Sequence, residues 1–101
     1  MVKVDWSYRA TNQLERAVQY IREEQGLAYA TIVAEKILSS TRNLESTPRI
    51  GPIEPLLEHK KSEYRYLVVW SYKVIYKVEK DRVIISRIFH TSQDPNKLRG
   101  V

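Results

Sequence analysis

The sequence contains no cysteine, which excludes disulfide bonds, cysteine-ligated metals and cysteine nucleophiles. His59 and His90 are the only histidines, too few for a histidine-built zinc site without help from carboxylates. We therefore expect neither a metal nor another cofactor. A chain without cysteine also fits the reducing cytoplasm, where we expect this protein to act.

Glycine and proline are also scarce, with 3 and 4 residues respectively. The sequence has no phosphate-cradling glycine loop, no dinucleotide fingerprint and no nucleophile elbow around a serine. No apolar run approaches the length of a membrane span, and the first residues, MVKVDW, lack the form of a signal peptide. We therefore expect no membrane partner.

The length and the apolar content predict one folded unit. A chain of 101 residues with 43% hydrophobic residues can bury a single modest core, so we expect one domain over 1–101. The formal net charge is +5, which suits contact with nucleic acid or with an acidic protein. Many ordinary basic proteins carry a similar charge.

The first half of the chain has helical periodicity. Residues 2–6 alternate apolar and polar side chains and predict a short strand, after which Ser7 stands where a helix N-cap is expected. One apolar stripe predicts a helix over 8–25, ended by Gly26, and a second predicts a helix over 27–45. So short a connection predicts an antiparallel helical hairpin, followed by a proline-containing loop over 47–62.

The second half is rich in β-branched and aromatic residues and predicts a meander with strands over 63–70, 72–79 and 82–89. Apolar residues alternate along its middle strand, at Tyr72, Val74, Tyr76 and Val78, and predict the face that packs against both helices. The expected fold is α+β: an N-terminal strand and an antiparallel helical hairpin packed on a three- to four-stranded antiparallel sheet. We expect the tail, 91–101, to be loosely held.

Cations are scattered along the same strands, at Arg65, Lys73, Lys77 and Arg87. They are either an ordinary solvated face of the sheet or a concave surface that binds the phosphates of a nucleic acid. The second interpretation requires all four side chains to converge.

One metal-free reaction needs only the groups that are present. Cleavage of RNA by its own 2′-hydroxyl requires a base, cations for the phosphate charge and an acid for the leaving oxygen. Glu54 is the candidate base, Lys73 with Arg65 the candidate clamp, and His90 the candidate acid. The alternative for His90 is a packing or capping role at the edge of the sheet.

Three segments, YRYLVV, YKVIYKV and RIFH followed by QDP, occur in an order and spacing that resemble the RelE/ParE superfamily. NLESTPRIG, at the end of the second predicted helix, is also similar to this family. Its members are toxins of bacterial type II toxin–antitoxin systems. The resemblance implies a RelE/ParE-like fold and a growth-arresting toxin that is neutralised by a cognate antitoxin.

The resemblance leaves the target open. RelE-like and YoeB-like members cleave ribosome-bound mRNA, whereas ParE-like members poison DNA gyrase without nuclease chemistry. Glu54 in IEPLLEH and His90 resemble the catalytic residues of the nucleases. Lys73, Leu67 and Thr91 depart from the nuclease pattern, and lysine lacks the bidentate grip of arginine on phosphate. A third alternative is a non-toxic domain that only binds its antitoxin.

Overall fold

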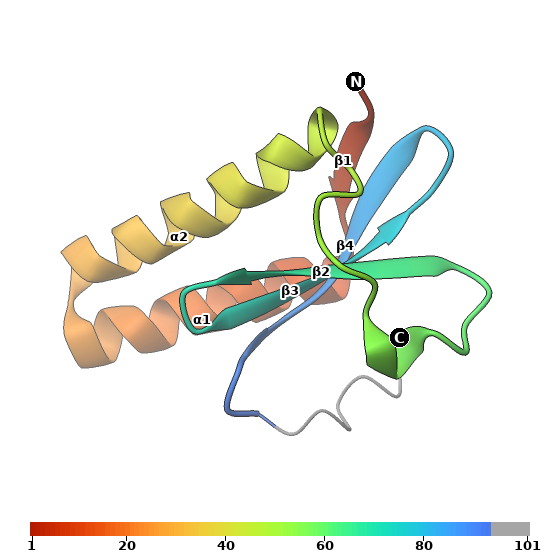
Figure 1. The fold of residues 1–101 in the computed structure, drawn as a ribbon. Coiled ribbons are helices and arrows are strands. Elements are labelled where there is room, and N and C mark those ends of the chain that lie inside the picture. Colours follow the sequence, from red (N-terminus) through yellow and green to blue (C-terminus); the bar gives the residue numbers. More distant parts are fainter. Residues whose placement is uncertain (94–101) are drawn as a thin grey trace.

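The computed structural model describes residues 1–93, and the predicted tail beyond residue 93 lies outside the described residues. The chain forms β1 (Lys3–Trp6), α1 (Tyr8–Gln25), α2 (Leu27–Arg42), β2 (Glu63–Val69), β3 (Tyr72–Val78) and β4 (Arg82–His90) (Figure 1). Short 3-10 turns lie at Asn43–Glu45 and Pro55–Leu57.

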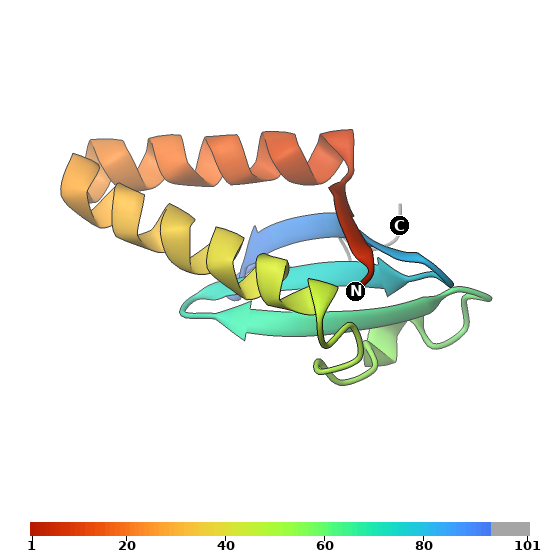
Figure 2. The same cartoon turned by 90° about the horizontal axis from the view of Figure 1, so that it is seen from above.

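The two helices form the predicted antiparallel hairpin and lie together on one face of the sheet (Figure 2). Ser7 caps α1 as expected, because its Oγ accepts a hydrogen bond from the Ala10 amide at 3.0 Å. Gly26, with a φ of 96°, separates the helices in a conformation that residues with a Cβ rarely adopt. The second helix was predicted to reach residue 45, but it ends at Arg42 and tightens into a 3-10 turn.

The four strands are ordered β1-β4-β3-β2. The β2, β3 and β4 strands form the predicted antiparallel meander, whereas β1 pairs with β4 in parallel. The predicted α+β architecture is therefore confirmed, with one correction: the sheet is mixed. After β1 the chain passes directly into the helical hairpin and reaches the other strands only after it. So long a connection permits parallel pairing of β1 with β4.

The main core lies between the helices and the sheet. The four residues of the predicted apolar face on β3 belong to it, together with Val83, Ile85 and Ile88 of β4 and side chains of both helices. The alternation on β4 shifts because Tyr76 pairs with Ile85 whereas Ile75 pairs with Arg87. Ser86 is thus an extra, bulged residue, and it changes which side chains of β4 face the helices.

The proline-containing loop is tied to the sheet at Gly51. The Gly51 amide donates a hydrogen bond to the buried hydroxyl of Tyr76 at 3.0 Å. A Cβ at this glycine would overlap the backbone carbonyl of Tyr66, so only glycine fits this close approach. Among residues 1–93, neither helix is both long enough and apolar enough to cross a bilayer.

We predict that Tyr76→Phe lowers the free energy of unfolding by about 1–3 kcal/mol, because it leaves the buried Gly51 amide without an acceptor. Urea denaturation monitored by circular dichroism measures the change. The control is Tyr8→Phe, which removes the same hydroxyl from a tyrosine that is 83% exposed. This change should affect stability little. Equal stability of the two variants would contradict the role of this hydrogen bond.

Candidate functional site

The helices cover one face of the sheet, and the 3-10 turn Pro55–Leu57 covers part of the other, which we term the open face. The open face carries Lys73, Ile75 and Lys77 of β3, whose register places them beside Phe89, Arg87 and Ile84 of β4. A small second cluster forms there around the buried Leu57 and Ile75, with Tyr64, Tyr66 and Phe89 packed against it. The cations predicted on this face therefore lie among apolar and aromatic side chains.

Glu54, the candidate base, is buried with 1% exposure and forms an ion pair with Lys73. Its Oε2 lies 2.7 Å from Lys73 Nζ, and its Oε1 accepts a hydrogen bond from the Leu56 amide at 3.2 Å. Among the described residues, the Lys73 ammonium is the donor group that reaches Oε2, so the charge on this oxygen depends on Lys73 for compensation. Lys73 also lies over the ring of Tyr66, 4.3 Å from its centroid. This pair fastens the proline-containing loop to the open face.

Arg65 does not join the other predicted cations. It pairs with Tyr76 in the register of β2 and β3, so it projects to the opposite face from Lys73 and Lys77. Its Nε donates to Glu63 Oε2 at 2.6 Å, and its Nη1 donates to the Gly51 carbonyl at 2.8 Å. Arg49 binds the same carboxylate, with its Nε 3.0 Å from Oε2. The predicted surface of four converging cations is therefore not formed, because strand alternation separates Arg65 from the rest.

His90, the candidate acid, pairs with Tyr72, so it projects toward the helices and away from Lys73. Its ring meets that of Tyr72 edge-on, with centroids 5.4 Å apart, and its Nδ1 lies 2.8 Å from Ser92 Oγ. Glu54 and Lys73 therefore form one group on the open face, and His90 belongs to another on the helix-facing side. The structure does not bring the three predicted catalytic residues together.

Arg87 is buried with 7% exposure, although it is one of the predicted nucleic-acid-binding cations. Its Nη1 donates to the Ser86 carbonyl at 2.9 Å, and within residues 1–93 it forms no salt bridge with a carboxylate. Burial lowers the pKa of this guanidinium, and the positive charge of Arg9 lowers it further. Arg87 therefore carries a positive charge that the groups of residues 1–93 compensate poorly.

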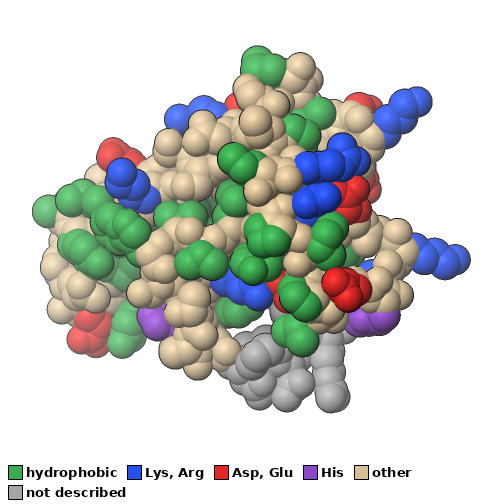
Figure 3. Space-filling view, viewed as in Figure 1, with side chains coloured by type: hydrophobic (Ala, Val, Ile, Leu, Met, Phe, Trp, Pro, Cys, Tyr) green, Lys and Arg blue, Asp and Glu red, His purple; other side chains and the backbone are tan. Residues whose placement is uncertain are grey.

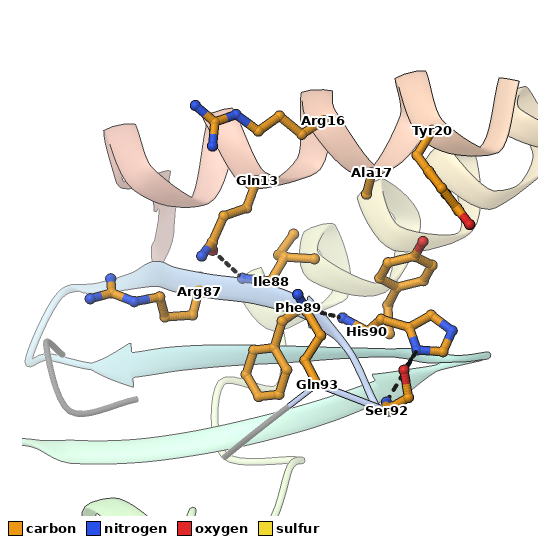
Figure 4. A pocket seen from close by; sticks show the side chains of 11 residues that line it. Gln13, Arg16, Ala17, Tyr20, Arg87, Ile88, Phe89, His90, Ser92 and Gln93 are labelled. Carbon is orange, nitrogen blue, oxygen red and sulfur yellow. Dashed lines mark hydrogen bonds between the residues drawn. The ribbon is translucent and has the colours of Figure 1, made fainter. Parts of the chain in front are cut away.

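A cavity of about 560 Å³ between α1 and β4 was not anticipated from the sequence (Figure 4). Gln13, Arg16 and Tyr20 of α1 line one side, and Arg87, Ile88 and His90 of β4 line the other. Burial raises the pKa of Tyr72, which also lines it. Gln13, Arg16 and Tyr20 are spaced so that they share one face of a helix. This shared polar face was the sign of the cavity that the sequence offered. Within residues 1–93, no three His, Asp or Glu side chains could hold a metal ion.

The turn between β2 and β3 presents an exposed aromatic surface. Trp70 is 48% exposed and stacks on Tyr29 of α2, with ring centroids 5.7 Å apart. Its φ of 55° is left-handed, a conformation that costs a bulky residue about 1–3 kcal/mol. Hydrophobic side chains gather on the surface at this end of the molecule (Figure 3). Tyr20, Tyr29 and Trp70 line one hollow there, and we term these three exposed residues the aromatic patch.

Comparisons with known proteins agree with this architecture. Residues 4–95 match the family model described as the ParE toxin of the type II toxin–antitoxin system parDE. The chain belongs to the ParE toxin family. The fold of this toxin is similar to that of a structure titled "Chromosomal ParDE TA system from P. aeruginosa", with a TM-score of 0.72 and 19% sequence identity. The similarity covers 89% of this chain and 96% of the other. No curated protein sequence matches this chain.

We predict that Glu54→Gln in this toxin lowers the free energy of unfolding by about 3 kcal/mol, because it breaks a buried ion pair. Urea denaturation measures the effect. Glu58→Gln is the matched control, since Glu58 follows in the same loop but is exposed, and it should change stability by less than about 0.5 kcal/mol. Unchanged stability of Glu54→Gln would contradict a structural role for the pair.

The toxin should also lose stability in acid through Glu63. Hydrogen bonds from Arg65 and Arg49 hold the pKa of this carboxyl below its ordinary value of 4.5. The stabilisation is therefore present above pH 4.5 and is lost as the pH falls through the lower pKa of the folded state. Unfolding free energies measured from about pH 6 to about pH 3 should fall less steeply in Glu63→Gln than in the natural sequence. The exposed Glu24→Gln should retain the steep fall.

Proposed function

We propose that this ParE-family chain is a growth-arresting toxin that acts by binding DNA gyrase and has no catalytic activity of its own. A cognate antitoxin neutralises it in the cytoplasm, and residues 1–101 act as one domain. The observation that carries the choice of mechanism is the separation of Glu54 and Lys73 from His90 on opposite faces of the sheet. A general base and a general acid must reach the same phosphodiester.

The burial of Glu54 supports the same choice. A base has to approach the 2′-hydroxyl within hydrogen-bond distance, but this carboxylate is 1% exposed and holds Lys73 at 2.7 Å. The Lys73 ammonium contacts the Glu54 carboxylate and the Tyr66 ring, so these contacts already engage the cation that a phosphate would need. Both residues are thus accounted for by the attachment of the loop to the sheet.

The aromatic patch supports a protein as the target. Exposed tryptophan and tyrosine side chains are enriched where proteins bind one another, because they bury a large area at little entropic cost. Trp70 remains at the tip of a hairpin despite its left-handed backbone, and its ring is held against Tyr29. A surface that is rigid before binding loses less entropy in a complex.

The second candidate is an endonuclease that cleaves ribosome-bound mRNA. The open face favours it, since Lys73, Lys77 and Arg87 all lie there. Arg65 would act outside this group, through the loop that it binds at Gly51. In this alternative, Glu54 and His90 keep the roles suggested by the resemblance to nuclease toxins.

We predict that the purified toxin inhibits gyrase supercoiling of relaxed plasmid and that His90→Ala inhibits equally well. Trp70→Asn should raise the concentration for half inhibition about tenfold, because it removes the ring. Asparagine tolerates the left-handed backbone, so the hairpin should be retained. Leu56→Asn is the control, since Leu56 is 49% exposed and lies outside the aromatic patch.

Primer extension on mRNA from cells expressing the toxin separates the two candidates. Intact transcripts during growth arrest are expected. Normal supercoiling at excess toxin, together with cleaved transcripts that disappear in His90→Ala, would replace the proposed function with the nuclease.

A further inference from the structure

Two glutamine side chains in the cavity between α1 and β4 have a fixed orientation. Gln13 Oε1 accepts a hydrogen bond from the Ile88 amide at 2.7 Å (Figure 4). Gln93 Oε1 accepts one from the His90 amide at 3.0 Å. A backbone N–H can be accepted by the side-chain oxygen but not by its nitrogen, so the NH2 group of each glutamine remains as a donor. Both glutamines line the cavity.

Arg87 adds further donors from β4. The residue is 7% exposed, and its Nη1 donates to the Ser86 carbonyl at 2.9 Å. Within residues 1–93, the guanidinium has no second hydrogen-bond acceptor, although such a group can donate several hydrogen bonds. Arg16 lines the same cavity from α1, and Figure 4 shows Arg87 lying below it. A buried charge with so few partners is costly unless an anion reaches it.

The amide and guanidinium groups left free in this cavity are therefore all donors. No aspartate or glutamate among residues 1–93 lines it. A ligand that complements such a lining has to bring several acceptor oxygens and a negative charge. A phosphate group offers both, and arginine binds it through charge-assisted, bidentate hydrogen bonds. The free polar groups thus select a phosphorylated ligand.

The remainder of the lining is apolar and aromatic. Tyr20, Tyr72 and Phe89 contribute rings, and Ala17 and Ile88 contribute aliphatic groups. The volume of about 560 Å³ far exceeds the size of a phosphate ion and is typical of sites for small organic ligands. Aromatic side chains stack on nucleobases of every kind. Cationic donors beside aromatic rings therefore fit a nucleotide better than free phosphate.

We propose that the cavity between α1 and β4 binds a free nucleoside monophosphate. Arg16, Arg87 and the NH2 group of Gln13 hold its phosphate. Its base packs against Tyr20 and Tyr72. No bond is made or broken at this site, which is apart from the ion pair that fastens the loop to the open face. The inference concerns a small ligand and does not depend on whether gyrase or mRNA is the target.

Tyr20 connects this site with the aromatic patch. It lines the cavity between α1 and β4, and it also lines the smaller hollow together with Tyr29 and Trp70. Tyr72 likewise belongs to both linings. A base held against these two tyrosines would therefore lie next to the surface that we propose for binding gyrase.

Titration calorimetry on the full toxin tests the ligand class, using the 5′-monophosphates of adenosine, cytidine, guanosine and uridine. At least one should bind at least about tenfold more tightly than inorganic phosphate and than its own nucleoside, because only the nucleotide contacts both parts of the lining. Absence of binding by all four, or affinities no better than that of phosphate, would overturn the proposal. So would a single-stranded oligonucleotide that binds about tenfold more tightly than every monophosphate.

Gln13→Glu tests the position of the phosphate. The carboxylate can still accept from the Ile88 amide, but it replaces the NH2 donor with an oxygen that repels phosphate. Nucleotide binding should weaken at least about tenfold. Gln19→Glu is the matched control, because it makes the same change at an exposed glutamine of α1 that does not line the cavity.

Equal nucleotide affinities of the two glutamate variants, with native circular dichroism in both, would overturn the proposal. Gyrase supercoiling assays on the same variants without nucleotide report on the proposed function alone. A toxin that inhibits gyrase but binds no nucleotide would remove this inference and leave the proposed function intact. A toxin that binds nucleotide at this site without inhibiting gyrase would do the reverse.

Discussion

A strand can direct each side chain to only one face of its sheet, and this constraint organises the molecule. Along β3, Tyr72, Val74 and Tyr76 enter the core beneath the helices. Lys73, between two of them, therefore has to emerge on the other face, where it meets Glu54. The same constraint sends His90 toward the helices, because it pairs with Tyr72. The face to which each side chain projects therefore decides which polar groups can come into contact.

The fold was largely predictable because its signals are local. Helical stripes, the Ser7 cap and Gly26 fixed the hairpin, and alternation on β3 identified the buried face. The parallel pairing of β1 was missed because four residues of alternating sequence carry no information on direction. The 3-10 turn after Arg42 was missed because its residues also continue the helical stripe.

The candidate site was less predictable, because it depends on register. Whether the four predicted cations share one surface depends on how three strands pair, and the pairing of β2 with β3 places Arg65 on the other side. The ion pair between Glu54 and Lys73 joins a loop to a strand, and no spacing in the sequence encodes that contact. The resemblance to toxins, by contrast, led to the family that residues 4–95 match.

The bulge at Ser86 has a consequence for how changes in chain length would act on this strand. One additional residue at this place puts Arg87 on the open face and Ile88 in the core, although Val83 and Ile85 precede them in regular alternation. If Ser86 stayed in the chain but the bulge were lost, regular alternation would turn Arg87 inward and Ile88 outward. Deleting Ser86 would instead leave an uninterrupted ladder, in which Arg87 follows Ile85 and every residue up to His90 keeps its face. Position 86 is therefore the place where β4 should tolerate the loss of a residue, whereas a deletion elsewhere between Arg82 and His90 would turn side chains to the wrong face.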